Sequence, residues 1–446
     1  MSPNPPSISV VIVGAGLAGL MTAIGLRRAG HQVTVLEKAP ELGQIGAGIQ
    51  VPPNATRIFK AWGLLDALNE VAEVPESATL RSYRGEALSR ISLLETMEPT
   101  YGTPYLSVHR VDLHHLLAQT AKEEGAQIRL GVDTQDIKTA GDRPVVQLAD
   151  GEIIEADLIL GADGERSTCR RILLNEPNML RDSGEHVYRV TVPIPEIAAA
   201  DEELQSLLSP PQINLWIGPG GNALTYRLKR DNLFNVVFMQ EHGPESDVPL
   251  IPQRVGKEVV AQEFQNGWDP KFWRILDLTS VCTRWTLLES DIAARWSDET
   301  GRVALIGDAA HAMGPYAGQG AALAFEDAAV LSTLFQRMVS PAQIPDLLTI
   351  YETIRKPRVE EMKRQVRWIR QRHSMRDGPQ QEERDRQLRE QAPFAGTANF
   401  LADPVFQPWM FGYDALAEAD KAWKTFSRGE FPGTRGTWRE GVNGSS

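Results

Sequence analysis

Residues 8–37 read ISVVIVGAGLAGLMTAIGLRRAGHQVTVLE. The run from Ile8 to Val13 is short, apolar and β-branched, which is typical of a buried strand. Apolar residues then recur at helical spacing from Leu17 to Arg28, and Gln32 to Leu36 is again strand-like. The stretch therefore predicts a strand, a glycine-rich turn, a helix and a second strand that form one unit.

The turn in this unit has the spacing Gly-x-Gly-x-x-Gly. Gly14, Gly16 and Gly19 allow the backbone to approach a pyrophosphate, whose charge the N-terminus of the helix stabilises. Glu37 ends the second strand about 20 residues further on, where a carboxylate accepts hydrogen bonds from an adenosine ribose. A turn that only packs the helix on the strand accounts for the glycines but not for this glutamate. The unit is therefore predicted to bind a dinucleotide.

The composition limits the class of protein. The chain has 446 residues, of which 42% are apolar and 23% charged, as in a folded protein of two or three lobes. A net charge of -12 argues against nucleic acid or an anionic membrane as a partner, because both attract basic surfaces. Only two cysteines occur, Cys169 and Cys282, without C-x-x-C spacing, so neither a disulfide framework nor a zinc site is expected. We expect a cytoplasmic protein with a small-molecule partner.

Two further kinds of site are not expected. The uncharged run from Ile8 to Leu26 is close to the length of a membrane span, but four glycines interrupt it and no positive charge precedes it. We therefore expect no integral membrane span. His114 and His115 are neighbours on a predicted helix and cannot share a face. Partners at ligand spacing are also lacking for His31, His186, His242 and His373, and His311 is expected to be structural. We expect no metal site.

Later strands of the same kind end in carboxylates. A buried strand from Leu158 to Leu160 runs into Asp163-Gly164, and a strand from Arg302 to Ile306 runs into Gly307-Asp308. Either could be an ordinary turn, but together they would place two carboxylates at the edge where parallel sheets bind ligands. Between them the pattern changes to alternating strands, which predict a separate antiparallel sheet. These strands are His186–Val192, Ile213–Ile217, Leu224–Leu228 and Phe234–Met239.

In these motifs the chain resembles the FAD-dependent aromatic hydroxylases, the group A flavoprotein monooxygenases, and in particular their salicylate hydroxylase-like fungal branch. The matching segments are the Gly14 to Glu37 unit, residues 109–113, residues 161–167, residues 307–320 and residues 409–414. The resemblance implies that Arg110 contacts the flavin cofactor. It implies that Asp163 serves the pyrophosphate region and that Asp308 holds the ribityl or pyrophosphate part of FAD. The flavin ring would be lined by Pro315, Gly318, Gly320 and Ala321.

The predicted substrate sheet offers a candidate catalytic pair, Arg189 and Tyr226. Strand alternation places Arg189 opposite Tyr188 and Val190, so Arg189 is either a cation that faces the flavin or a solvated surface charge. The resemblance favours the first, with the arginine holding the substrate as a phenolate. Two departures from the family pattern, Gly314 and Arg227, are expected near the pocket and affect its shape.

The predicted fold is α/β with α+β additions. A discontinuous Rossmann-like FAD-binding domain with a parallel sheet comprises residues 1–75, 101–183 and 281–370. An antiparallel-sheet substrate domain comprises residues 76–100 and 184–280, and residues 371–446 form a C-terminal helical and irregular segment. Residues 355–391 are predicted as a long charged amphipathic helical stretch.

The predicted function follows from the resemblance. FAD, reduced by NAD(P)H as co-substrate, would react with O2 to a flavin C4a-hydroperoxide, which transfers one oxygen atom to a small aromatic substrate of the phenol, hydroxybenzoate or indole type. The protein is expected to be a monomer or a homodimer. A flavin-linked dehydrogenase or reductase and a non-catalytic FAD-binding protein are the alternatives. The sequence leaves open the identity of the substrate, the position of oxygenation and the choice between NADH and NADPH.

Overall fold

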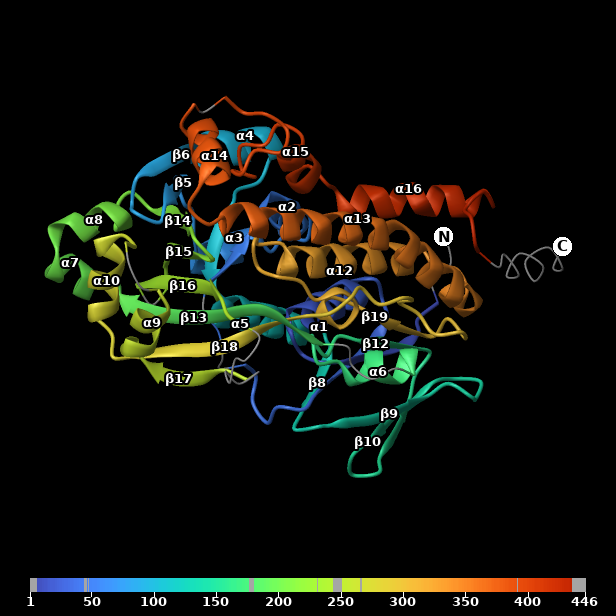
Figure 1. Ribbon diagram of the computed structural model, residues 1–446. Coiled ribbons are helices and arrows are strands. Elements are labelled where there is room, and N and C mark those ends of the chain that lie inside the picture. The colour runs from blue at the N-terminus through green and yellow to red at the C-terminus, as the bar shows by residue number, and fades with distance from the viewer. Residues whose placement is uncertain are drawn as a thin grey trace.

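The fold is built on two sheets, which lie at different ends of the molecule (Figure 1). The computed structural model describes residues 6–43, 46, 48–175, 180–230, 232–243, 251–264, 267–390 and 392–434. Every statement below concerns these residues.

The first sheet is parallel throughout and follows from the β-branched strands of the sequence. Its strand order is β19 (Val303–Leu305), β12 (Leu158–Gly161), β1 (Ser9–Val13), β2 (Gln32–Glu37) and β8 (Gln127–Leu130). The helices associated with it are α1 (Leu17–Arg28), α5 (Arg110–Glu123), α6 (Thr168–Leu174) and α11 (Asp308–His311). Between β8 and β12 the chain forms a small antiparallel sheet of β9 (Thr134–Lys138), β10 (Val145–Leu148) and β11 (Ile153–Glu155).

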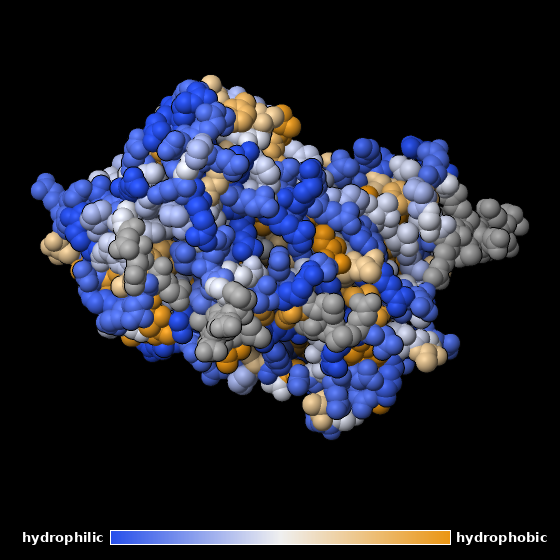
Figure 2. Space-filling model, in the orientation of Figure 1, coloured by the Kyte–Doolittle hydropathy of each residue, from blue (hydrophilic) through white to orange (hydrophobic). Residues whose placement is uncertain are grey.

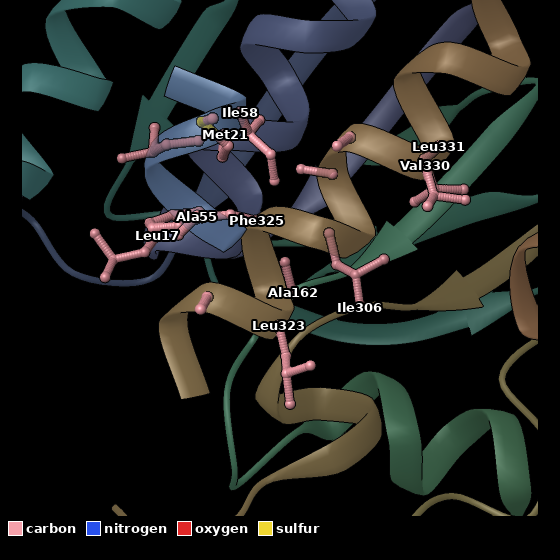
Figure 3. Packing of buried hydrophobic residues seen from close by; sticks show 14 of the residues in the cluster. Leu17, Met21, Ala55, Ile58, Ala162, Ile306, Leu323, Phe325, Val330 and Leu331 are labelled. Carbon is pink, nitrogen blue, oxygen red and sulfur yellow. The ribbon is translucent and has the colours of Figure 1, made fainter. Parts of the chain in front are cut away.

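The main core lies where α12 (Gly320–Gln336) packs against α1 and α2 (Pro53–Ala61) beside the parallel sheet (Figure 3). Leu20, Met21 and Ile24 of α1 are fully buried there. Helices α1 and α12 approach closely at Gly25, where an added Cβ would lie 1.9 Å from the hydroxyl oxygen of Ser332. This packing fixes the N-terminus of α12 close to the glycine-rich turn.

The second sheet has eight strands and is antiparallel except for the parallel pair β14–β5. Its order is β17 (Gln253–Gly256), β18 (Val281–Glu289), β13 (Arg181–Pro193), β16 (Leu233–Glu241), β15 (Gly221–Leu228), β14 (Gln212–Gly218), β5 (Ser77–Ser82) and β6 (Ala87–Ser92). One face packs on short helices through residues such as Tyr188 and Phe238. These helices are α7 (Ile194–Ala200), α8 (Glu202–Leu208), α9 (Lys257–Glu263) and α10 (Pro270–Asp277). Val187, Tyr226 and Met239 on the other face belong to the main core; we call this face the free face because these four helices do not cover it.

The remaining elements join the two sheets. A small sheet of β3 (Gly48–Val51), β7 (Leu106–His109) and β4 (Ala72–Glu73) is accompanied by α3 (Leu65–Val71) and α4 (Leu93–Tyr101). The C-terminal part contains η1 (Pro341–Gln343), α13 (Ile344–His373), α14 (Pro379–Arg389), α15 (Phe406–Phe411) and α16 (Ala415–Ser427). Helices α13 and α16 lie along α12 (Figure 1).

The predicted fold class is confirmed, and the structure changes details within it. Strand β18 pairs with β13 in the large sheet, although the sequence places residues 281–289 with the FAD-binding domain. A division that follows the sheets therefore moves this boundary beyond Glu289. The charged stretch predicted from residue 355 is part of two helices, α13 and α14, separated at residues 374–378. Residue 391, its predicted end, lies outside the described residues.

The drawn face of the surface is mostly hydrophilic, with small apolar areas between charged groups (Figure 2). Large apolar side chains that are exposed, such as Ile153 and Val405, come from different elements. Among the described residues, no helix combines the length and the apolar character that a membrane span requires.

Candidate functional site

A cavity of about 400 Å³ lies where the carboxyl ends of the parallel strands meet the free face of the large sheet. This volume is within the range of small-molecule sites. The lining residues that follow strands of the parallel sheet are Gly16, Ala162, Gly164 and Asp308. Those on the large sheet are Val187, Arg189, Leu224, Tyr226, Val237, Met239, Trp285 and Leu287.

A different feature of the structure explains the glycine at each of the three positions in the turn. Gly14 has φ +107°, and an added Cβ would lie 2.4 Å from the carbonyl oxygen of Ala162. At Gly19 a Cβ would lie 2.0 Å from the carbonyl oxygen of Gly14, so only glycine lets α1 pack against the turn. At Gly16, which precedes α1 and lines the cavity, no atom of the described residues lies within 4 Å of an added Cβ. Gly16 therefore leaves open space at the N-terminus of a helix, where a pyrophosphate binds.

Glu37 holds the turn in place and still has capacity for a ligand. Its carboxylate accepts hydrogen bonds from the backbone N–H of Ala15 at 2.8 Å and of Ala39 at 2.9 Å. Each carboxylate oxygen has a second acceptor position, which a ribose hydroxyl can use. His114 supports the same turn, because its Nε2 lies 2.6 Å from the carbonyl oxygen of Ala15. This contact cannot be predicted from the sequence, in which His114 is a candidate only for a metal site.

The two carboxylates predicted at the sheet edge have different environments. Asp308 is exposed to the cavity at the start of α11. Arg110 lines the same cavity; burial lowers the pKa of its guanidinium, and the charge of Asp308 opposes this shift. Asp163 instead accepts hydrogen bonds from the Ser167 hydroxyl and the Cys169 N–H, so it caps α6. Asp163 is not among the residues that line the cavity, whereas its neighbour Gly164 is.

The loop before α12 forms the wall between the two sheets. Pro315, Gly318, Gly320 and Ala321 all line the cavity, as the resemblance implies. Gly318 has φ +63°, and an added Cβ would lie 2.7 Å from Oε1 of Gln50. The first turn of α12 contains no acidic residue. Its free N–H groups can therefore stabilise a negative charge on a bound ring.

Arg189 and Tyr226 lie on the free face of the large sheet and line the cavity together. Arg189 lies over the ring of Trp285, with 5.2 Å between the guanidinium carbon and the ring centroid. Burial lowers the pKa of Arg189, and the interaction with Tyr226 opposes this shift. The Nε of Arg189 has no hydrogen-bond partner within the described residues. Burial also raises the pKa of Tyr226, against the influence of Arg189. The pair is thus a half-buried cation and a buried phenol on the large-sheet wall of the cavity, and the charge of Arg110 lowers the pKa of Arg189 further.

The alternation along β13 explains this placement. Tyr188 and Val190 pack against the helices on the covered face, which leaves Val187 and Arg189 toward the cavity. Alternation places Thr191 on the same face as Arg189, but Thr191 is exposed and is not among the residues that line the cavity. Beyond Arg189 the strand therefore leaves the site.

The two departures from the family pattern lie in different places. Gly314 lines the cavity, where an added Cβ would make ordinary contacts with Tyr316 and Val366. Arg227 does not line it, because its neighbour Tyr226 uses the cavity face of β15; its Nε lies 3.6 Å from a carboxylate oxygen of Glu73. The expected influence of Arg227 on the pocket is therefore corrected.

A buried charge cluster supports the loop that carries Asp308. Asp327 of α12 accepts hydrogen bonds from the Gly307 N–H at 3.0 Å and from Arg355 at 2.8 Å, and its carboxylate lies 2.7 Å from Nε2 of His311. Its neighbour Glu326 pairs with both Arg355 and Arg358. The cluster is not among the predicted site residues, but the sequence does carry a signal for it: two acidic residues within the apolar run of α12 require buried partners.

These features define a dinucleotide-binding protein in which a second sheet closes a small-molecule cavity over the nucleotide-binding turn. Residues 7–366 match a family model described as FAD binding domain. The chain belongs to this family of FAD-dependent monooxygenases. The cofactor is FAD, and the resemblance predicted from the sequence is confirmed.

Relatives cover nearly the whole chain. It is 36% identical over 420 residues to FAD-dependent monooxygenase OpS4 of Beauveria bassiana (strain ARSEF 2860), covering 93% of this chain and 97% of that protein. It is 34% identical over 419 residues to 3-amino-4-hydroxybenzoate 2-monooxygenase PtmB3 of Streptomyces platensis, covering 93% and 98%. The fold is similar to the crystal structure of CtdE in complex with FAD and a substrate, with a TM-score of 0.81, 21% identity and coverage of 95% and 99%.

Proposed function

We propose that this protein uses FAD, O2 and NAD(P)H to add one oxygen atom to a small phenolic ring. The observation that carries the proposal is Arg189, a half-buried cation in the cofactor cavity whose Nε has no hydrogen-bond partner in the part of the chain that the structure describes. Such a cation gains a charge-assisted hydrogen bond from a ligand that supplies a negatively charged oxygen. A phenolate oxygen is such a ligand, and the Streptomyces relative acts, by its name, on a hydroxylated ring.

The residues around the cavity fit FAD. Gly16 offers an uncovered helix N-terminus for the pyrophosphate, and Glu37 has acceptor positions left for the ribose. Arg110 and Asp308 would contact the flavin and its ribityl chain, and the N-terminus of α12 would face the ring. Asp163 would act indirectly, by holding α6 and the backbone of Gly164 at the cavity edge.

The protein groups have separate tasks in the reaction. Bound FAD would supply the activation of O2 and the electrophilic oxygen atom. Arg189 would stabilise the phenolate form of the substrate, which makes the ring electron-rich. Tyr226 would donate a hydrogen bond to the same oxygen, because its raised pKa keeps it protonated. Val187, Leu224 and other apolar lining residues would exclude water from the reacting atoms.

The alternatives predict different measurements. A flavin-linked dehydrogenase would use the same cofactor residues without incorporating oxygen, and a non-catalytic FAD-binding protein would not oxidise NAD(P)H. The test is NAD(P)H oxidation and O2 uptake by the purified yellow protein, with and without a panel of phenols, hydroxybenzoates and indoles. We expect a phenol to stimulate both rates and to form an oxygenated product. Lack of stimulation by every compound, with FAD bound, would contradict the proposal.

The division into a discontinuous FAD-binding domain and a substrate domain is part of this proposal, with β18 assigned to the substrate sheet. The cytoplasmic location and the monomeric or homodimeric state stay predictions.

A further inference from the structure

A second, smaller cavity adjoins the flavin cavity. Gln50, Leu224, Met239 and Pro315 line both. The space open to the centres of water molecules is about 60 Å³, which is room for roughly four to six non-hydrogen atoms. Its walls come from the free face of the large sheet and from residues 398–401 of the C-terminal part. The cavity is therefore too small for a second ring system but large enough for a substituent.

The walls of this cavity are apolar or uncharged, and none of its lining residues is Asp, Glu, Lys or Arg. The apolar lining residues include Ala78, Leu80, Ile213, Leu215, Phe400 and Leu401. His373 is the lining residue that could carry a positive charge, but burial lowers its pKa to about 4. Its Nε2 lies 3.0 Å from the carbonyl oxygen of Ala398 and holds the C-terminal wall. A carboxylate in this cavity would therefore be buried without a cation.

One polar side chain of the cavity wall, Asn222, has hydrogen-bonding capacity left for a ligand. Asn222 is 1% exposed, and its side-chain amide interacts with the hydroxyl of Tyr316, another lining residue. An amide group has two N–H donors, and within the described residues neither the amide nitrogen nor the amide oxygen makes a hydrogen bond of good geometry. Alternation along β15 places Asn222, Leu224 and Tyr226 on the same face, toward the two cavities. A carbonyl oxygen that accepts a hydrogen bond from the amide of Asn222 would remove the cost of this buried donor.

We propose that this cavity is a binding subsite for a short, uncharged acyl substituent of the phenolic substrate, recognised through its carbonyl oxygen by Asn222. The inference rests on the proposed function, because it places the phenol ring at Arg189 in the adjoining cavity. It names the substrate class as hydroxyphenyl ketones and related acyl phenols, in contrast to hydroxybenzoates.

The test measures dissociation constants for the FAD-loaded protein, from the change in flavin absorbance and from calorimetry, separately from turnover. The ligands are hydroxybutyrophenone, butylphenol, hydroxyoctanophenone and hydroxybenzoate, each as the 3- and the 4-substituted isomer. The 3-substituted ligands form one series and the 4-substituted ligands the other, and in at least one of the two we expect hydroxybutyrophenone to bind most tightly. Butylphenol should bind about five- to tenfold more weakly, because it lacks the carbonyl. The longer ketone and the carboxylate should bind at least about tenfold more weakly.

Two variants locate the subsite. Ala78→Leu fills the cavity from β5 and should weaken binding of hydroxybutyrophenone about tenfold or more. Ala87→Leu is the matched control on the neighbouring strand β6, where the residue is exposed and does not line the cavity, and it should leave this constant unchanged. Asn222→Leu should remove the difference between hydroxybutyrophenone and butylphenol. Flavin content and thermal unfolding show whether each variant is folded.

The outcomes separate the subsite from the proposed function. Equal binding of butylphenol and hydroxybutyrophenone, or of hydroxybenzoate and hydroxybutyrophenone, by the wild-type protein in both series would overturn the subsite, whatever the variants do. Tight binding of the ketone without any oxygenated product would support the subsite and contradict the proposed function.

Discussion

At the scale of single residues, the account depends on the side of β13 that carries Arg189. The sequence allowed a solvated charge or a cation at the flavin, since alternation alone does not tell which face of a strand is covered. The structure covers the face of Tyr188 and Val190 with helices and leaves Arg189 at the cavity beside Trp285. A position that a sequence pattern left undecided thus becomes a specific hypothesis about substrate binding.

Replacement of Arg189 should reduce turnover of a phenolic substrate without loss of FAD. A charge-assisted hydrogen bond is worth about 1.5 to 3 kcal/mol, so Arg189→Ala should lower kcat/KM roughly ten- to a hundredfold. Arg189→Lys keeps the charge but loses the planar fork and should recover only part of this. Product formation and uncoupled NAD(P)H oxidation are measured together. Arg181→Ala, an exposed arginine on the same strand, is the control; wild-type turnover in Arg189→Ala would contradict the assigned role.

At the scale of elements, the first β-α-β unit was readable because local rules and the tertiary structure agree. The predicted helix Leu17–Arg28 is observed with the same bounds, and Gly14 and Gly19 are required by contacts under 2.5 Å to an added Cβ. Gly16 differs, because its missing side chain leaves space for the ligand and contributes nothing to packing.

Gly16→Val should therefore purify as a folded protein with little flavin. The side chain would overlap the pyrophosphate position, and overpacking of about 1 to 3 kcal/mol corresponds to roughly five- to a hundredfold weaker FAD binding. The flavin-to-protein absorbance ratio and circular dichroism give the two readouts. Gly141→Val changes an exposed glycine between β9 and β10 and should retain normal flavin. Full flavin content in Gly16→Val would refute the position given to the pyrophosphate.

The interface of α12 and α13 depends on buried charges. The sequence pattern of residues 355–391 predicts an amphipathic helix but not these charge pairs. Removing the charge of Glu326 by Glu326→Gln leaves Arg355 and Arg358 without their shared partner. Breaking a buried pair in this way costs about 3 to 5 kcal/mol. Urea unfolding should show this loss, whereas Glu299→Gln, in an exposed pair with Arg295, should change the free energy of unfolding by less than about 1 kcal/mol. Equal effects of the two changes would show that the cluster does not stabilise the fold.

At the scale of the whole molecule, the sequence predicted the parts that depend on local patterns. The parallel strands, the glycine turn and the cavity residues of the loop before α12 follow from spacing and motif. The parallel pairing of β5 with β14 and the place of β18 in the large sheet depend on contacts between distant segments, which no local period reports. The same holds for the wall formed by residues 398–401, which closes the smaller cavity.

The dependence of stability on pH tests the burial of His373, which contacts this wall at Ala398. Burial lowers the pKa of His373 to about 4, from an ordinary value of 6.5, so between these values the unfolded chain binds a proton that the folded protein does not. Stability contributed by neutral His373 is therefore complete above pH 6.5 and is lost as the pH falls toward 4, by up to about 3 kcal/mol. His373→Gln, which can still donate to Ala398, should lose less stability across this window than the wild-type protein. Identical pH profiles of the two unfolding free energies would exclude a buried neutral His373.

The central claim is that the cavity performs oxygenation of a phenolic ring. It is tested most directly by turnover of the FAD-loaded protein with NAD(P)H and a phenolic substrate under oxygen-18 gas, with the mass of the product as readout. The account predicts one labelled oxygen atom in each product molecule. A product whose new oxygen comes from water, or NAD(P)H oxidation that leaves the phenol unlabelled, would contradict it.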